Sequence, residues 1–115
     1  MKKILALLGA LLLSCGGAEQ RSGLNSSFVP SSTGTTYLGV EDEKETIHFS
    51  STVELDAGEI TIFVVNPRKD TVFVKRYWKP DEYQESTEFS PLGGTWQAGY
   101  ISKNGNGYIE LELYY

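Results

Sequence analysis

The stretch IHFSSTVEL at residues 47–55 alternates between two kinds of side chain. Its odd-numbered positions are apolar apart from one serine: Ile47, Phe49, Ser51, Val53 and Leu55. The positions between them are polar, from His48 to Glu54. A period of two with one apolar face is typical of a β-strand that covers a core on one side and faces solvent on the other.

Turn signals divide the chain beyond this strand into further short strands. Residues 59–66 (EITIFVVN) are rich in β-branched residues and apolar on both faces, which predicts a central strand. Residues 71–78 (TVFVKRYW) are its expected partner, because the proline between Asn66 and Arg68 and the nearby Asp70 favour a turn.

Three more strands are expected toward the C-terminus, over 83–89, 95–102 and 108–115. The Asn-Gly steps at 103–107 predict a tight hairpin between the last two. Six or seven short strands and no helical period predict an all-β domain, a small antiparallel β-sandwich of jelly-roll type, with a compact barrel as the alternative. Fourteen side chains form the expected core: Ile47, Phe49, Val53, Ile60, Ile62, Val64, Val72, Val74, Phe89, Trp96, Ile101, Ile109, Leu111 and Leu113.

Three motifs carry a resemblance to known sandwich modules. They are Leu-x-x-Gly-x-Ile-x-Ile-x-Val-x-Asn-Pro at 55–67, Gly-Thr-Trp at 94–96 and Gly-x-Gly-x-Ile-x-Leu-x-Leu at 105–113. Together they resemble the small jelly-roll-type sandwiches appended to secreted proteins, such as pre-peptidase C-terminal and proprotein-convertase-type domains. The resemblance rests on turn glycines and core positions, so it implies a fold more than a function.

The N-terminus has the pattern of an export signal. Two lysines follow Met1, and residues 4–13 (ILALLGALLL) form an apolar run. That run is too short for a transmembrane helix, which needs about 20 apolar residues. Residues 1–14 are therefore expected to be a cleaved signal peptide.

Residues 12–15 (Leu-Leu-Ser-Cys) resemble the lipobox of bacterial lipoproteins. The resemblance implies cleavage before Cys15, attachment of a diacylglyceryl group to its sulfur and often acylation of the new amine by a fatty acid such as palmitate. Two or three such chains hold a protein on a membrane essentially permanently. In a Gram-negative host, Gly16 is not the Asp that resembles an inner-membrane retention signal, so the outer membrane or cell surface is expected.

Residues 15–36 are expected to form the lipidated end and a flexible tether, because Gly, Ser, Thr and Asn dominate there. The globular domain is then expected over 37–115. An alternative interpretation gives Phe28 and Val29 to a first edge strand that Pro30 stops, because proline is tolerated at sheet edges.

Length and charge exclude several classes of function. A chain of 115 residues has room for one small domain. The formal net charge is -5, and removal of the signal peptide's two lysines makes it more negative. Such a surface repels nucleic acid, and membrane attachment has to come from the lipid. Cys15 is the only cysteine, so the exported domain is expected to fold without a disulfide.

Residues for catalysis or metal binding are not grouped in any recognisable motif. His48 is the only histidine and lies on the polar face of its strand, as a solvated side chain would. No serine has a nucleophile motif around it. The acidic run at 41–45 offers oxygen atoms that could bind Ca²⁺, but it lacks a defined calcium-loop register. We therefore expect no enzyme activity, no cofactor and no metal, and an exposed acidic loop at 41–45.

Aromatic residues offer the best candidates for a binding site. Tyr77, Trp78 and Tyr83 flank the loop at 79–81, and Tyr100 stands on a late strand. Exposed, these rings would form a stacking platform for a sugar or a hot spot for a protein; buried, they would fill the rim of the core. The leading hypothesis is a non-enzymatic envelope module that binds a protein or a carbohydrate. The alternatives are a structural lipoprotein that assembles through a sheet edge and, less favoured, a small hydrolase.

Overall fold

The computed structural model describes residues 20–41 and 44–115. The predicted signal peptide, Cys15 and the first residues of the predicted tether lie outside these described residues. Within them every regular element is a β-strand. The eight strands are β1 (Arg21–Phe28), β2 (Ser32–Val40), β3 (Ile47–Ala57), β4 (Ile60–Val65), β5 (Thr71–Tyr77), β6 (Asp81–Phe89), β7 (Gly94–Ser102) and β8 (Asn106–Tyr114).

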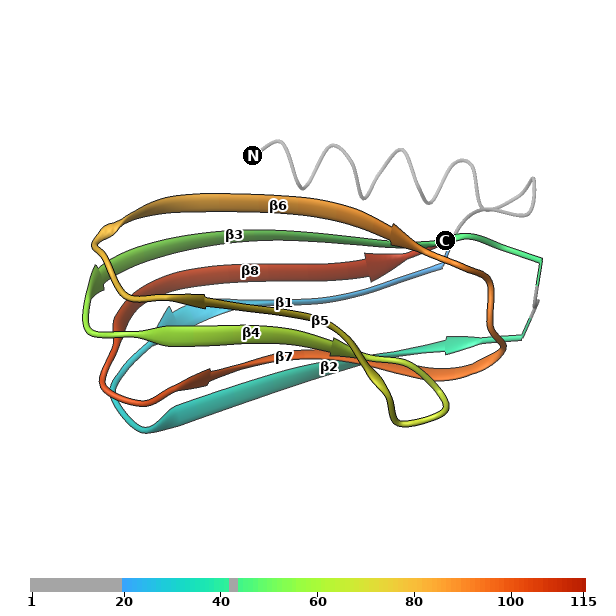
Figure 1. The fold of residues 1–115 in the computed structure, drawn as a ribbon, viewed down its shortest axis with the longest axis horizontal. Coiled ribbons are helices and arrows are strands. Elements are labelled where there is room, and N and C mark those ends of the chain that lie inside the picture. The colour runs from blue at the N-terminus through green and yellow to red at the C-terminus, as the bar shows by residue number, and fades with distance from the viewer. Residues whose placement is uncertain (1–19, 42–43) are drawn as a thin grey trace.

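The strands form two antiparallel sheets of four strands each, here called sheet A and sheet B (Figure 1). Sheet A has the order β1-β8-β3-β6, and sheet B has the order β2-β7-β4-β5. The chain changes sheet at every connection except the β4–β5 hairpin, which is the arrangement of an eight-stranded jelly roll. The predicted β-sandwich is therefore confirmed, with eight strands instead of six or seven.

Residues 21–36 are part of the sandwich, although the sequence predicts a flexible tether there. β1 pairs with β8 along its whole length, from Arg21↔Tyr114 to Phe28↔Gly107. β2 pairs in the same way with β7. Phe28 is fully buried, and β1 ends there, two residues before Pro30. The alternative of an edge strand before Pro30 is therefore correct for Phe28, although Val29 lies outside the strand and the strand begins at Arg21.

The tether prediction failed because edge strands need few apolar residues. β1 and β2 are the edge strands on one side of the two sheets, so each is covered by fewer neighbours than a central strand. Between them the hydroxyls of Ser22 and Thr36 form a hydrogen bond. Serine and threonine, which suggest a loop by composition, thus join the two sheets at this edge.

The core lies between the two sheets and contains most of the side chains predicted for it. Ten of the fourteen are buried: Ile47, Phe49, Val53, Ile60, Ile62, Val64, Trp96, Ile109, Leu111 and Leu113. Phe89 is half-buried against this cluster. The sequence missed Phe28, Leu38, Val40, Leu55, Tyr77, Ala98 and Tyr100, which are also buried.

Three predicted core residues are exposed, namely Val72, Val74 and Ile101. On β5 the inward side is taken by Phe73 and Tyr77, because a bulge in β5 opposite Val64 and Val65 shifts the register of the β4–β5 pair. On β7 the residues on either side of Ile101 are buried, so alternation turns Ile101 outward.

The predicted C-terminal hairpin is also wrong. β7 pairs with β2 and β4, whereas β8 pairs with β1 and β3 in the other sheet. The segment between them crosses from sheet B to sheet A, and the buried Ser102 hydroxyl donates to the carbonyl of Gly105 at 2.8 Å. The β4–β5 hairpin, in contrast, is confirmed: the amide of Lys69 donates to the carbonyl of Asn66 at 2.9 Å.

Candidate functional site

The two sheets expose outer faces of opposite character. The strands of sheet A carry eight carboxylates and one arginine. The strands of sheet B carry no carboxylate, and their charges are Lys75 and Arg76 on β5. Of the other described lysines and arginines, four lie in turns that flank sheet B strands: Arg68, Lys69, Lys79 and Lys103. The segments that flank these strands also carry Glu41, Glu59 and Asp70, so the margin of sheet B has charges of both signs. The strands of sheet A are therefore acidic, and the outer face of sheet B is apolar.

A row of paired side chains crosses the outer face of sheet A. Its residues are Arg21, Tyr114, His48 and Glu88, one from each strand at matching positions. The Arg21 guanidinium lies 4.9 Å from the Tyr114 ring centre, and the His48 ring stacks on the other side at 5.0 Å. His48 Nδ1 is 3.2 Å from a Glu88 carboxylate oxygen. The single histidine of the chain therefore packs against Tyr114 and pairs with Glu88 within this row.

The outer face of sheet B collects large hydrophobic side chains. We define the apolar face by Tyr37 on β2, Ile101 on β7, Phe63 on β4, Val74 on β5 and Trp78 just after β5. Four of them are strongly exposed: Tyr37 at 58%, Ile101 at 50%, Val74 at 60% and Trp78 at 59%. Among described residues, the other large exposed hydrophobics are Val29 and Val72. The sequence did not identify this face, because its residues come from four separate segments.

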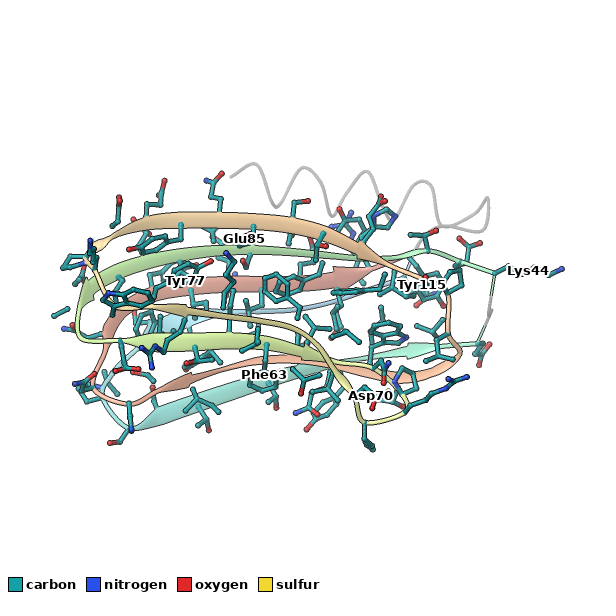
Figure 2. The ribbon with its side chains drawn as sticks, viewed as in Figure 1. Lys44, Phe63, Asp70, Tyr77, Glu85 and Tyr115 are labelled. Atoms are coloured by element: carbon teal, nitrogen blue, oxygen red, sulfur yellow. The ribbon has the colours of Figure 1, made fainter. Side chains whose placement is uncertain are left out.

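Phe63 occupies the centre of the apolar face (Figure 2). It pairs across β4–β7 with Gly99. A side chain at Gly99 would have its Cβ 2.8 Å from the Phe63 ring and 2.6 Å from the backbone oxygen of Gly34. The absence of a side chain at Gly99 therefore leaves room for the tip of the Phe63 ring.

Two of the four predicted binding residues meet at the other edge of the sandwich, between β5 and β6. The Tyr77 and Tyr83 rings stack with centroids 4.0 Å apart. The Tyr77 hydroxyl donates to a Glu85 carboxylate oxygen at 3.1 Å, and the Tyr83 hydroxyl donates to the Lys79 carbonyl at 2.5 Å. Burial, together with the negative charge of Glu85, raises the pKa of Tyr77 well above its usual range. Tyr77 is buried and Tyr83 is half-buried, so this pair fills the rim of the core.

The remaining two predicted binding residues differ in solvent exposure. Tyr100 is buried, with its ring 5.9 Å from that of Phe28. Trp78 is exposed, and the Arg76 guanidinium lies 5.3 Å from its ring centre. Of the four, Trp78 is therefore the one whose side chain is largely open to solvent.

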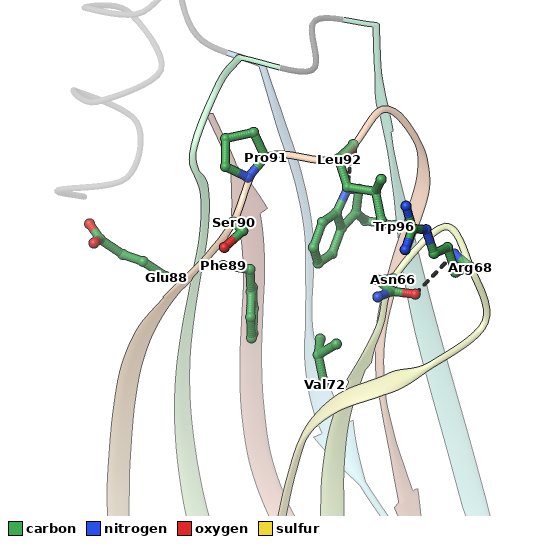
Figure 3. Close-up of a pocket in the computed structure, with 9 residues that line it drawn as sticks. All are labelled: Asn66, Arg68, Val72, Glu88, Phe89, Ser90, Pro91, Leu92 and Trp96. Atoms are coloured by element: carbon green, nitrogen blue, oxygen red, sulfur yellow. Dashed lines mark hydrogen bonds between the residues drawn. The ribbon is translucent and has the colours of Figure 1, made fainter.

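A pocket lies at the end of the sandwich where the β4–β5 turn meets the β6–β7 loop (Figure 3). Its wall includes Trp96, whose indole nitrogen donates to the Leu92 carbonyl at 2.9 Å. The Phe89 ring stacks on Trp96 with a centroid distance of 5.5 Å. This aromatic pair gives the pocket a rigid apolar wall.

Metal ligands are not grouped in the described part of the chain: no three His, Cys, Asp or Glu residues come together there. Within residues 20–41 and 44–115 there is likewise no helix of the length and hydropathy needed to cross a bilayer.

Comparison with known proteins supports the fold. No protein-family model and no curated protein matches the chain. Among solved structures, the CBM36-1 domain of a multidomain xylanase from the hindgut metagenome of Trinervitermes trinervoides is similar with a TM-score of 0.50 and 7% identity, over 81% of this chain and 95% of that one. A structure titled Family 16 Carbohydrate Binding Module-2 gives a TM-score of 0.49 and 11% identity, over 72% of this chain and 70% of that one. A Bacillus endospore appendage protein gives a TM-score of 0.47 and 10% identity, over 84% of this chain and 87% of that one. The similarity to the CBM36-1 domain supports a shared β-sandwich fold. The resemblance to pre-peptidase C-terminal domains stays a prediction.

Proposed function

We propose that this protein is a non-catalytic binding module, held on the outer membrane by lipid at Cys15, that docks a protein partner through the apolar face. The lipid anchor rests on the sequence pattern before Cys15. The docking surface rests on one observation: Tyr37, Ile101 and Val74 on sheet B, and Trp78 directly after β5, are all at least half exposed.

The composition of the apolar face favours a protein over a carbohydrate. Trp, Tyr and Arg are the residues enriched in protein hot spots, and Trp78, Tyr37 and Arg76 supply all three. Val74 and Ile101 add branched aliphatic groups, which complement apolar side chains better than they complement sugar hydroxyls. A carbohydrate partner is the second candidate, favoured by the exposed rings of Tyr37 and Trp78.

The charged residues of sheet B indicate which charge the partner surface carries. The strands of sheet B lack carboxylates, and their two basic residues, Lys75 and Arg76, stand on β5. Arg76 also lies 3.7 Å from a Glu59 carboxylate oxygen. A partner with an apolar centre and an acidic group opposite β5 complements this pattern, and such complementarity speeds association and excludes wrong partners. We therefore expect binding that weakens as the salt concentration rises.

The experiment compares native complexes extracted from membranes with mild detergent. Wild-type full-length chain is expected to migrate in a complex larger than the monomer, and the Val74→Thr/Ile101→Thr double variant is expected to migrate as the monomer. A matched control is Ser50→Thr/Thr52→Ser on the outer face of sheet A, which should leave the complex intact. Threonine keeps the strand propensity, so the folding of the face variant is preserved.

Two outcomes would contradict the proposal. If both double variants keep the complex, the apolar face does not hold the partner. If two differently tagged copies of the chain are captured together, the complex is an assembly of this protein, as the structural alternative requires. In the same cells, Cys15→Ala should release the protein from the membrane fraction; retention after a high-salt wash would contradict the lipid anchor.

A further inference from the structure

The pocket at the β4–β5 turn is separate from the apolar face and has its own chemistry. Its volume is about 460 Å³, within the range of small-molecule sites. Its apolar wall comes from Val72 on β5, Phe89 on β6 and Leu92 in the following loop, with Trp96 behind them (Figure 3). A ring-sized apolar group fits such a wall.

Asn66 presents a hydrogen-bond donor to the pocket. Its Oδ1 accepts the amide hydrogens of Arg68 at 2.9 Å and Asp70 at 3.0 Å. These two bonds fix which end of the side-chain amide is oxygen. The NH₂ group is therefore the end that points toward the pocket, as Figure 3 shows.

Arg68 supplies the positive charge of the pocket. Its side chain runs from the turn toward Leu92 and Trp96 at the mouth (Figure 3). Glu88, also at the pocket, points away from it, and its carboxylate pairs with His48 at 3.2 Å on the outer face of sheet A. Lys69 and Asp70 belong to the same turn but do not line the pocket.

We infer that this pocket binds a small organic acid, with its carboxylate at Arg68 and Asn66 and its apolar body against Phe89, Val72 and Leu92. A guanidinium and an amide NH₂ both donate, and a carboxylate accepts hydrogen bonds from both. Neutral amides and amines lack this match, because an amide has no charge for Arg68 and an amine is repelled by it. This site is independent of the docking function proposed for the apolar face.

The test is an NMR titration of the full chain in detergent micelles, with phenylacetate as the probe. The side-chain amide of Asn66 and the indole N–H of Trp96 are the reporters. We expect saturable shifts of both signals with phenylacetate and much weaker ones with phenylacetamide or phenethylamine. Arg68→Gln should weaken phenylacetate binding by about tenfold or more, the loss typical of a charged hydrogen bond.

Lys69→Gln is the matched control, since it removes the same charge from the neighbouring position outside the pocket. It should bind phenylacetate within about twofold of the wild type. Val72→Glu, which places a carboxylate at the apolar wall, is a second variant and should abolish the shifts. Absence of saturable shifts in the wild type, equal binding of the amide, or equal loss in Lys69→Gln and Arg68→Gln would overturn the inference.

Discussion

The Tyr77 hydroxyl donates a hydrogen bond to Glu85 at 3.1 Å, across the edge where β5 of one sheet meets β6 of the other. At the opposite edge, Ser22 and Thr36 form the equivalent link between β1 and β2. Each open side of the sandwich is thus closed by a polar pair, while the interior between them is apolar. Most of the large exposed hydrophobics among the described residues lie instead on the outer face of sheet B.

The Tyr77–Glu85 bond predicts a loss of stability at alkaline pH. Burial and Glu85 raise the pKa of Tyr77 above the unfolded value of about 10. Above that pH the unfolded chain releases the phenol proton and the folded chain keeps it, so the free energy of unfolding falls as pH rises. Urea unfolding curves measured on both sides of pH 10 should show a smaller decline in Tyr77→Phe than in the wild type. An equal decline would mean that Tyr77 does not contribute.

The two tryptophans should differ sharply on truncation. Trp78 is 59% exposed and contacts Arg76, so Trp78→Ala should change stability by at most about 1 kcal/mol. Trp96 is 1% exposed, and Trp96→Ala should cost about 3–5 kcal/mol. Melting curves of the two variants provide the comparison. A large loss of stability in Trp78→Ala would mean that the ring is packed in the core and does not belong to the apolar face.

The turn between β3 and β4 depends on glycine at position 58. Gly58 has φ +75°, and a Cβ there would lie 1.9 Å from the backbone oxygen of Asn104. Gly58→Ala should therefore cost more than about 2 kcal/mol, from left-handed backbone strain and displacement of the 103–105 segment. Gly39 is the control, because a Cβ there meets nothing within 4 Å. Gly39→Ala should be neutral or slightly stabilising in chemical denaturation.

The N-terminal limit of the folded domain can be tested by truncation. A chain that begins at Gln20 keeps β1 and β2, and should unfold in one cooperative transition. A chain that begins at Thr36 loses β1, the buried Phe28 and about half of β2, so one edge of β8 has no partner strand. It should show no cooperative transition by circular dichroism. Equal melting temperatures would mean that residues 20–35 act as the tether that the sequence predicts.

The sequence predicted the strands best where both faces are apolar or where apolar and polar residues alternate regularly. β3 and β4 are central strands, and their inward positions, such as Phe49 and Ile62, are apolar at every second residue except Ser51 of β3. β1 and β2 are edge strands in which serine and threonine alternate with a few apolar residues, and composition alone cannot distinguish that pattern from a linker. The side of β5 that faces the core depends on a bulge in β5 itself, where Val72 has no partner residue on β4, and no local pattern reveals it.

The candidate site was predictable only in part. Trp78 follows a strand and stands two residues before Pro80. The sequence therefore identified it as a candidate for an exposed ring. Tyr77 and Tyr100 could not be separated from it by residue type, and both are buried. The apolar face joins Tyr37 to Ile101 and Val74 through the β2-β7-β4-β5 order, so it exists only once the strand order is known.

Site-specific photo-cross-linking in cells tests the docking proposal most directly. A photoreactive residue at position 101, on the outer face of sheet B, should give a cross-linked adduct with another protein. The same residue at position 50, on the outer face of sheet A, should give none. Adducts of equal yield from both positions, or from position 50 alone, would contradict docking through the apolar face.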